Sequence, residues 1–327
     1  MTIPGDADER WWVEVAGNNQ TRADELRPAL LAFVAFSPGW EASIEGCGFV
    51  IAGHSKFAAV ITARHVLLEG VFRTQKPRPA YAPSALFIRK SSTLPSISPE
   101  KLKVVWMSTQ HGAMLDVCHV AYNETLDVAC CVVTPQDRDG EVFQPVSLPI
   151  DTAVPRVGDI IHMVSLDNLT TTELAPPIDK SGIGRLFQLT RRVSIRVGVV
   201  TGVHPDGYRQ YRWPCFTTSI PAEPGMSGGL VFLPREGKTI SACGIVCADN
   251  STDEARADHL ICGESVIACA WPALALRAPD CIPTTTKTRT RSLYEFIRSG
   301  DMPMAVGGID HIDMMELENG DCKIRLR

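Results

Sequence analysis

Short runs of apolar, β-branched and aromatic residues recur along the chain, each bounded by Gly, Pro, Asn or Asp. Few segments show the helical period, and the runs do not alternate with helical segments of about 10–15 residues. This pattern predicts an all-β barrel or sandwich and disfavours a doubly wound α/β sheet. The expected strands are Ala29–Ser37, Gly48–Ala52, Phe57–Thr62, Leu102–Met107, Val128–Val133, Ile160–Ser165, Val193–Val199, Gly229–Leu233, Ala242–Cys247 and Val266–Ala270.

Polar segments separate these runs and predict long loops. The expected loops are Gln75–Pro99, Asp167–Gly184 and Asp249–His259. After Pro283 the composition changes, and the Thr284–Arg291 stretch is most simply a solvated linker. Ser292 is placed to cap a short helix that runs through Arg298. From about His311 the chain resembles a β-hairpin with Asn319-Gly320 as a type I′ turn.

Length and charge narrow the classes of protein. The 327 residues suffice for about two domains, and the 45% hydrophobic and 21% charged content is that of an ordinary globular protein. A formal net charge of −5 gives no basic field for a phosphate backbone, so nucleic acid is not an expected partner. No apolar run approaches the roughly 18 residues that a membrane helix needs, so no membrane partner is expected either.

The chain start and the cysteines bear on location. Asp6, Asp8 and Glu9 precede any apolar stretch, so no secretory signal is visible and a cytoplasmic location is expected. The 11 cysteines are an odd number, and in a reducing compartment they are expected to be buried thiols rather than disulfides.

Three motifs along the chain carry the residue types of nucleophilic acyl transfer. They are Thr62-Ala63-Arg64-His65-Val66, Leu126-Asp127-Val128-Ala129 and Gly225-Met226-Ser227-Gly228-Gly229. A serine is a poor nucleophile unless a histidine takes its proton, and a buried aspartate then holds the histidine tautomer. The small residues around Ser227 allow the N–H groups of Gly225 and Ser227 to point at a developing oxyanion. The order His65, Asp127, Ser227, with each motif attached to a strand-like run, predicts a catalytic triad.

Two other interpretations of these residues are weaker. A Gly-x-Ser-x-Gly string also describes the nucleophile elbow of α/β-hydrolases, but that elbow needs a helix after the serine and a histidine downstream of it. Cys243, Cys247, Cys262 and Cys269, with His259, could form a zinc set, but their spacing is unlike paired CxxC motifs and most lie in apolar runs. We therefore expect structural thiols, with neither a metal nor an organic cofactor.

The motifs resemble those of the trypsin-like serine peptidases, most closely the HtrA-like or Deg-like branch. The segment Gly46-Cys47-Gly48-Phe49-Val50-Ile51 is similar to the family's strand before the catalytic histidine, and Pro224–Leu230 to its nucleophile loop. Gly244-Ile245-Val246 resembles the strand that lines the substrate cleft, and Val266–Pro272 the last pocket strand. The resemblance covers about Ala29 to Leu276.

This resemblance implies two six-stranded antiparallel β-barrels with the active cleft between them and a short C-terminal extension. The implied organisation is an N-terminal extension (1–28), a first barrel (29–155), a second barrel (156–280) and a C-terminal linker, helix and hairpin (281–327). It further implies a substrate pocket with Pro221 at its base and walls near Cys247, Ala248, Asp249 and Ile267. Because Pro221 is uncharged, we expect small or medium apolar side chains before the scissile bond.

The chain also departs from the family. The separation of 62 residues between His65 and Asp127 is long, which the Gln75–Pro99 insertion explains, and no PDZ-like domain follows Leu276. Met226 stands where the digestive branch has an aspartate that pairs with a newly cut N-terminus. We therefore expect competence without a cut between Arg10 and Ala29, either alone or on binding a regulatory partner protein.

The sequence thus predicts a serine endopeptidase that hydrolyses peptide bonds of protein or peptide substrates through an acyl-enzyme. His65, Asp127 and Ser227 would be catalytic, and Gly225 and Ser227 would form the oxyanion hole. The alternative is a catalytically silent barrel that binds a peptide or a partner protein.

Overall fold

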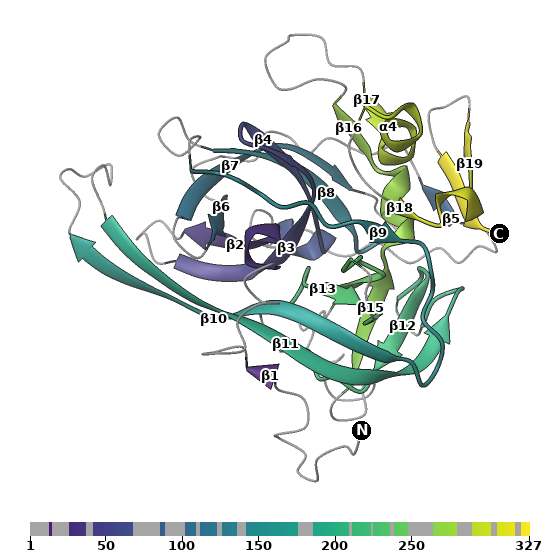
Figure 1. Cartoon of the computed structure of the whole chain (residues 1–327), viewed down its shortest axis with the longest axis horizontal. Coiled ribbons are helices and arrows are strands. Elements are labelled where there is room, and N and C mark those ends of the chain that lie inside the picture. The colour runs from purple at the N-terminus through teal and green to yellow at the C-terminus, as the bar shows by residue number, and fades with distance from the viewer. Residues whose placement is uncertain are drawn as a thin grey trace.

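The computed structural model describes sixteen segments of the chain, and within them two closed, six-stranded antiparallel β-barrels (Figure 1). This confirms the all-β, double-barrel prediction. The described residues are 13–14, 26–36, 42–67, 86–88, 102–108, 112–122, 126–135, 142–175, 186–208, 211–223, 225–235, 239–247, 264–279, 290–301, 306–317 and 322–327.

The first barrel follows the strand order β2-β3-β4-β8-β7-β6, and β6 pairs with β2 to close the ring. Its strands are β2 (Leu30–Phe36), β3 (Ala42–His54), β4 (Phe57–Thr62), β6 (Leu102–Met107), β7 (Gly112–Tyr122) and β8 (Ala129–Pro135). A short 3₁₀ turn, η1 (Arg27–Ala29), leads into β2. Closure leaves no exposed sheet edge in this barrel, so its backbone groups are paired around the ring.

The second barrel follows the order β11-β10-β13-β14-β15-β12, and the β11–β12 pairing closes it. Its strands are β10 (Ile160–Ala175), β11 (Leu186–His204), β12 (Cys215–Thr218), β13 (Leu230–Phe232), β14 (Gly244–Val246) and β15 (Ser265–Cys269). The two-residue strand β1 (Val13–Glu14) adds to β11 from outside.

Each of the ten expected runs overlaps an observed strand, and each barrel has one strand that the pattern did not single out. In the first barrel that strand is β7, in which Asp116 and His119 interrupt the apolar residues. In the second barrel it is β12, which is only four residues long. A ring can close only through these strands, since β7 joins β6 to β8 and β12 joins β11 to β15.

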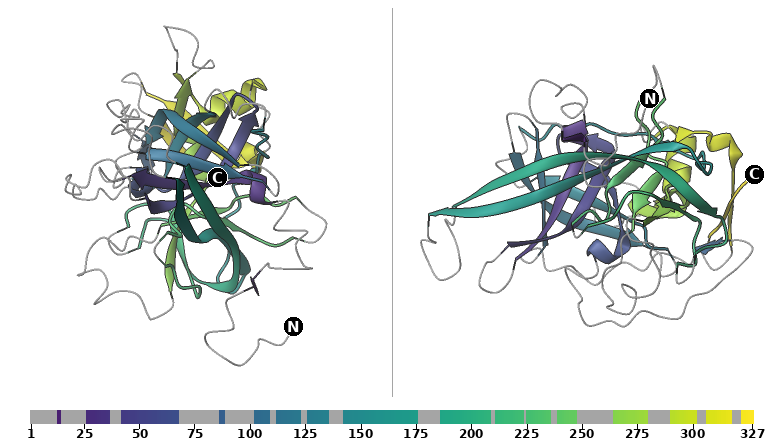
Figure 2. Two further views of the ribbon diagram at one scale, coloured as in Figure 1. Left: turned by 90° about the vertical axis from the view of Figure 1, so that its left-hand side faces the viewer. Right: turned by 90° about the horizontal axis from the view of Figure 1, so that it is seen from below.

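Two expected loops contain strand. Residues 167–175, in the expected loop Asp167–Gly184, continue β10 and pair with β11 out to Ala175↔Leu186. The misjudged stretch is polar, but its run of Thr170 to Thr172 is β-branched and suits a two-stranded ribbon that has no barrel interior to fill. Figure 2 shows this ribbon projecting well beyond the barrels. The other two expected loops lie mostly outside the described residues, apart from β5 (Leu86–Ile88) within Gln75–Pro99.

The C-terminal segment packs back onto the barrels. After the 3₁₀ turn η2 (Trp271–Ala275), β16 (Arg277–Pro279) pairs with β17 (Thr290–Ser292). Farther on, β18 (Val306–Gly307) pairs in parallel with β9 (Ile150–Asp151) in the connection between the barrels. The Oγ1 of Thr152 donates to the Gly307 carbonyl oxygen at 2.9 Å, which reinforces this attachment.

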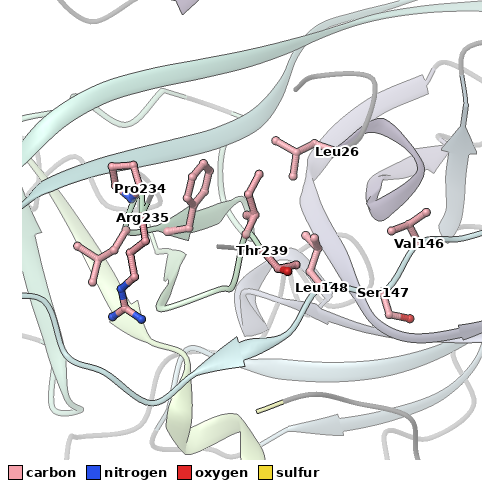
Figure 3. A pocket seen from close by; sticks show the side chains of 10 residues that line it. Leu26, Val146, Ser147, Leu148, Pro234, Arg235 and Thr239 are labelled. Carbon is pink, nitrogen blue, oxygen red and sulfur yellow. The ribbon is translucent and has the colours of Figure 1, made fainter. Parts of the chain in front are cut away.

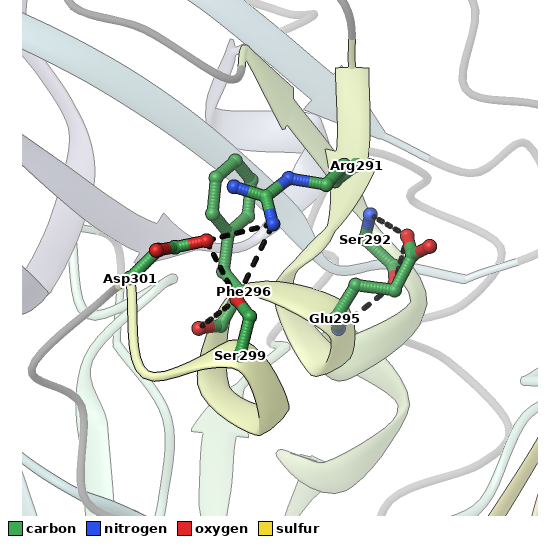
Figure 4. Close-up of polar contacts among 6 residues, drawn as sticks. All are labelled: Arg291, Ser292, Glu295, Phe296, Ser299 and Asp301. Carbon is green, nitrogen blue, oxygen red and sulfur yellow. Dashed lines mark hydrogen bonds and ion pairs between the residues drawn. The ribbon is translucent and has the colours of Figure 1, made fainter.

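The predicted helix and hairpin are both present in this segment. Helix α4 (Leu293–Ser299) begins at Ser292, whose side chain accepts from the Glu295 N–H while the Glu295 carboxylate accepts from the Ser292 N–H (Figure 4). A 3₁₀ turn, η3 (Ile309–His311), precedes the hairpin of β19 (Ile312–Glu316) and β20 (Cys322–Leu326). β20 also pairs with β5, and the expected Asn319-Gly320 turn lies outside the described residues.

Part of the expected linker Thr284–Arg291 is instead structured. Arg291 pairs with Asp301 at 2.8 Å, and its guanidinium carbon lies 4.3 Å from the Phe296 ring centroid. The linker interpretation is therefore wrong for the end of this stretch, because cation–π packing and an ion pair hold Arg291 against α4.

Replacing Ser292 with alanine should lower the free energy of unfolding by about 1 kcal/mol, because the buried capping box would lose its acceptor for the Glu295 N–H. Denaturant unfolding measures this change. Ser55→Ala, in an exposed turn, is the matched control and should stay within about 0.5 kcal/mol of wild type. Equal stability of the two variants would contradict the capping role.

Candidate active site

Strand register in the first barrel brings His65 and Asp127 together. Thr62, the last residue of β4, pairs with Ala129, the first residue of β8. The two strands are antiparallel, so the chain leaves β4 at the same end of the sheet at which it enters β8. His65, three residues after Thr62, and Asp127, two residues before Ala129, therefore both lie beyond that end. His65 sits there in a helical turn at residues 64–67, and Asp127 lies in the approach to β8.

Both carboxylate oxygens of Asp127 accept hydrogen bonds from His65. The Nδ1 of His65 lies 2.7 Å from Oδ2, and the His65 backbone N–H donates to Oδ1 at 3.0 Å. Asp127 is only 5% exposed, and burial alone would raise its pKa. The charge and hydrogen bonds of His65, with a smaller effect of Arg64, outweigh burial and lower the pKa to about 2. The carboxylate is therefore ionised and holds the ring by its Nδ1 side.

Ser227 belongs to the second barrel but lies against the first. Its carbonyl oxygen accepts from the backbone N–H of Cys47 on β3 at 2.7 Å. A Cβ placed on Gly46 would lie 2.5 Å from that carbonyl oxygen and 2.5 Å from Cγ2 of Val66. Since Val66 follows His65, these contacts place Ser227 beside the turn that carries the histidine. The structure thus brings all three predicted triad residues to the junction of the barrels.

The loop before Ser227 is a tight turn with glycine in a left-handed conformation. The Met226 N–H donates to the Glu223 carbonyl oxygen at 3.1 Å, and Gly225 has φ +89°. Glycine adopts such a positive φ without steric cost, whereas residues with a side chain are strained there. A Cβ on Gly225 would have Cγ2 of Ile44 as its nearest neighbour, at 3.9 Å. Backbone conformation, rather than space, therefore favours glycine at position 225.

Cys47 joins the two barrels through its side chain as well as its backbone. Its Sγ lies 3.1 Å from the Gly225 carbonyl oxygen, and it accepts from the Leu166 N–H at 3.2 Å. The Oγ1 of Thr62 donates to the Cys47 carbonyl oxygen at 2.6 Å. The sequence predicted only a buried thiol at this position, whereas the structure shows a contact point for both barrels.

The predicted pocket residues are placed only in part. Pro221 begins the segment that leads to the nucleophile loop, Ile267 is buried on β15, and Ala248 and Asp249 lie outside the described residues. Cys247 is fully buried, and its Sγ donates to the carbonyl oxygen of Asp127 at 3.3 Å. Burial, with the nearby Asp127 charge, raises the pKa of this thiol, so it stays protonated. Cys247 therefore helps to hold the Asp127 backbone in place. The substrate pocket stays a prediction.

One buried cation at this site was not singled out from the sequence. Arg196, on β11, is 0% exposed and bonds to the segment from Pro221 to Met226. Its signal in the sequence is a charged residue in the middle of the apolar run Val193–Val199. A charge in such a position needs buried partners.

A separate cavity of about 430 Å³ lies elsewhere between the barrels (Figure 3). Leu26, Leu148 and Phe232 are among its lining residues, and none of the predicted site residues lines it. Arg235 at its edge forms an ion pair with Asp151 at 2.9 Å. The cavity is therefore distinct from the site formed by His65, Asp127 and Ser227.

The described residues offer no group of three or more His, Cys, Asp or Glu side chains that could hold a metal ion. Cys243, Cys247 and Cys269 are buried thiols in the second barrel, whereas Cys262 and His259 of the zinc alternative lie outside the described residues. Within the part of the chain described, no helix is long and apolar enough to cross a membrane.

Comparison with protein families agrees with this geometry. The model of the trypsin-like peptidase domain matches residues 46–241, which is more than half of the chain and includes His65, Asp127 and Ser227. The chain therefore belongs to the trypsin-like peptidase family.

The chain is similar to solved structures at low sequence identity. An inactive serine-to-alanine mutant of Rv3671c from M. tuberculosis H37Rv is 14% identical, covering 83% of this chain and 94% of that chain with a TM-score of 0.38. The structure titled GrC is 14% identical, with coverages of 89% and 96% and a TM-score of 0.40. Human heparin binding protein is 13% identical, with coverages of 79% and 90% and a TM-score of 0.40. No curated protein matches the chain. The family assignment rests on the family model.

The depressed pKa of Asp127 predicts a pH dependence of stability. Because the folded-state pKa of about 2 lies below the ordinary 3.8, ionised Asp127 contributes stability that is present above about pH 4 and is lost as the pH falls toward 2. The contribution is about 2 kcal/mol. Unfolding free energies of wild type and Asp127→Asn should therefore converge by that amount between pH 5 and pH 2. If the difference in unfolding free energy between the two proteins stays constant from pH 5 to pH 2, the lowered pKa of Asp127 is contradicted.

Proposed function

We propose that the protein is a serine endopeptidase that cleaves protein or peptide substrates through an acyl-enzyme. The observation that carries this proposal is the buried Asp127 carboxylate, which holds His65 by two hydrogen bonds beside the inter-barrel contact of Ser227. A histidine fixed through Nδ1 presents Nε2 for proton transfer, as a general base for a serine hydroxyl requires.

In the proposed reaction, His65 takes the Ser227 Oγ proton as that oxygen attacks the scissile carbonyl. The imidazolium then gives this proton to the leaving amine, and a water molecule hydrolyses the acyl-enzyme by the same route. Asp127 orients His65 and stabilises its charged form. No metal or organic cofactor takes part in this scheme.

The amides of Gly225 and Ser227 are the proposed oxyanion donors. Around them, the N–H groups of Met226, Gly228 and Gly229 donate to the carbonyl oxygens of Glu223, Val246 and Met226, which fixes the course of the loop. Gly225 has a left-handed backbone conformation, and this conformation sets the direction in which the Gly225 N–H points.

The branch and the location of the enzyme are proposed on narrower support. The motifs around Cys47 and Ser227 favour the HtrA-like or Deg-like branch. All nine cysteines in the described part of the chain are free thiols, which supports the cytoplasm as the proposed location. A regulatory partner protein is the proposed restraint on such an enzyme.

Loss of either Ser227 or His65 should abolish activity. Ser227→Ala and His65→Ala should each lower kcat by at least about 10⁴-fold, because the triad acts as one unit. Covalent labelling by a fluorophosphonate probe, detected on a gel, measures the reactivity of the serine. Wild type should be labelled and Ser227→Ala should not. Ser147→Ala, which removes a serine at the separate cavity, is the matched control and should label like wild type. A folded wild type that does not label would favour the catalytically silent alternative.

Small or medium apolar side chains, such as Val, Ala or Leu, should be preferred before the scissile bond. Pro221 offers no charge, and the Glu223 carboxylate is engaged by Arg196 at 2.8 Å. A peptide library measures this preference. Selection of Lys or Arg would contradict the expectation and would point to Asp249 as the acid in the pocket.

A further inference from the structure

Arg196 is a fully buried charge directly beneath the nucleophile loop. It lies on β11 opposite Met163 of β10, and it is among the largest fully buried side chains of the protein. Burying a guanidinium is costly unless it is neutralised and its N–H groups find acceptors. The position of these acceptors therefore indicates what the charge holds in place.

The guanidinium contacts three residues of one short segment. Its Nη1 donates to the Pro221 carbonyl oxygen at 3.1 Å and lies 2.8 Å from the Met226 Sδ. Its Nη2 donates to Oε2 of Glu223 at 2.8 Å. The fork of a single arginine thus joins Pro221, Glu223 and Met226.

These contacts are coupled to the turn that carries the proposed oxyanion donors. The Met226 Sδ also accepts from the Glu223 N–H at 3.2 Å, while the Met226 N–H closes the turn onto the Glu223 carbonyl oxygen. Gly225 lies inside this turn, and Ser227 follows it directly. A movement of either end of the turn would therefore move both proposed donors.

We propose that Arg196 is a positioning residue that holds Pro221, Glu223 and Met226, and with them the amides of Gly225 and Ser227, in the conformation that receives the oxyanion. This inference rests on the proposed peptidase function. Arg196 does not touch the substrate in this role. Its charge is neutralised by Glu223, and its remaining acceptors exist together only when the turn is formed.

In this arrangement Arg196, a residue of the uncleaved chain, orders the nucleophile loop. Met226 carries no charge that could receive the ammonium of a new N-terminus. A cation supplied by β11 instead organises the loop from inside the second barrel, so no cut is needed to create one. This agrees with the expectation that the chain is competent without cleavage between Arg10 and Ala29.

The test compares wild type with Arg196→Met, Arg196→Lys and Glu223→Gln in the full chain. Methionine keeps much of the buried volume without charge or donors, lysine keeps the charge but loses the planar fork, and glutamine keeps an acceptor for Nη2. The measurements are kcat and KM on a cleaved peptide, and the affinity for a peptide boronate. The tetrahedral adduct of the boronate with serine places an oxygen in the oxyanion hole. Circular dichroism and denaturant unfolding verify the fold of each variant.

Arg196→Met should lower kcat by about 10²–10³-fold, as loss of an oxyanion donor does, while KM stays within about threefold. Boronate affinity should fall in parallel with kcat, which a merely structural role would not produce. The kcat and the boronate affinity of Arg196→Lys should lie between those of wild type and Arg196→Met. Glu223→Gln keeps an acceptor for Nη2 but removes the charge that neutralises Arg196, so its kcat should fall between those of wild type and Arg196→Met.

Folded Arg196 variants with wild-type kcat and boronate affinity would overturn the proposal, as would a rise in KM at unchanged kcat. If Arg196→Met does not fold, Arg196→Lys decides by the same criteria. Failure of both to fold would make Arg196 a requirement of the fold and would also count against the proposal. A wild type that neither labels with fluorophosphonate nor cleaves peptides would instead overturn the peptidase function itself.

Discussion

The close approach of the nucleophile loop to strand β3 is the constraint on which the site depends. The Cys47 N–H bonds to the Ser227 carbonyl oxygen at 2.7 Å, and the Gly228 N–H bonds to the Val246 carbonyl oxygen at 2.8 Å, so the loop is attached to both barrels. Gly228 has φ +81°, and a Cβ there would lie 2.0 Å from the Cys47 carbonyl oxygen. Any side chain at this position would separate the loop from β3 and carry Ser227 away from His65.

Two buried charges, Asp127 and Arg196, specify the arrangement on either side of this contact. Each has a partner of complementary polarity: His65 bonds to both oxygens of the aspartate, and Glu223 neutralises the arginine. Buried ion pairs add little net stability compared with apolar packing, but breaking one leaves a charge unpaired at high cost. Alternative positions of the histidine or of the loop are thereby disfavoured.

The C-terminal segment contributes to the same geometry from a distance. Its strand β18 pairs with β9 in the connection between the barrels, and Thr152 in that connection bonds to Gly307. Its hairpin also pairs with β5, from the insertion between β4 and β6. Because these pairings join segments far apart in sequence, they restrict movement of the inter-barrel connection without taking part in the proposed chemistry.

The sequence by itself determined the strand runs, the candidate triad residues and the capped helix, because each depends on a local pattern or on a motif of a few residues. It did not reveal that residues 167–175 extend β10, since a polar ribbon lacks the apolar alternation that burial imposes. Tertiary structure alone decided the partners of Arg196 and the role of Cys47 between the barrels. Such contacts join residues 25 to 180 positions apart, and their energies depend on which groups the fold buries together.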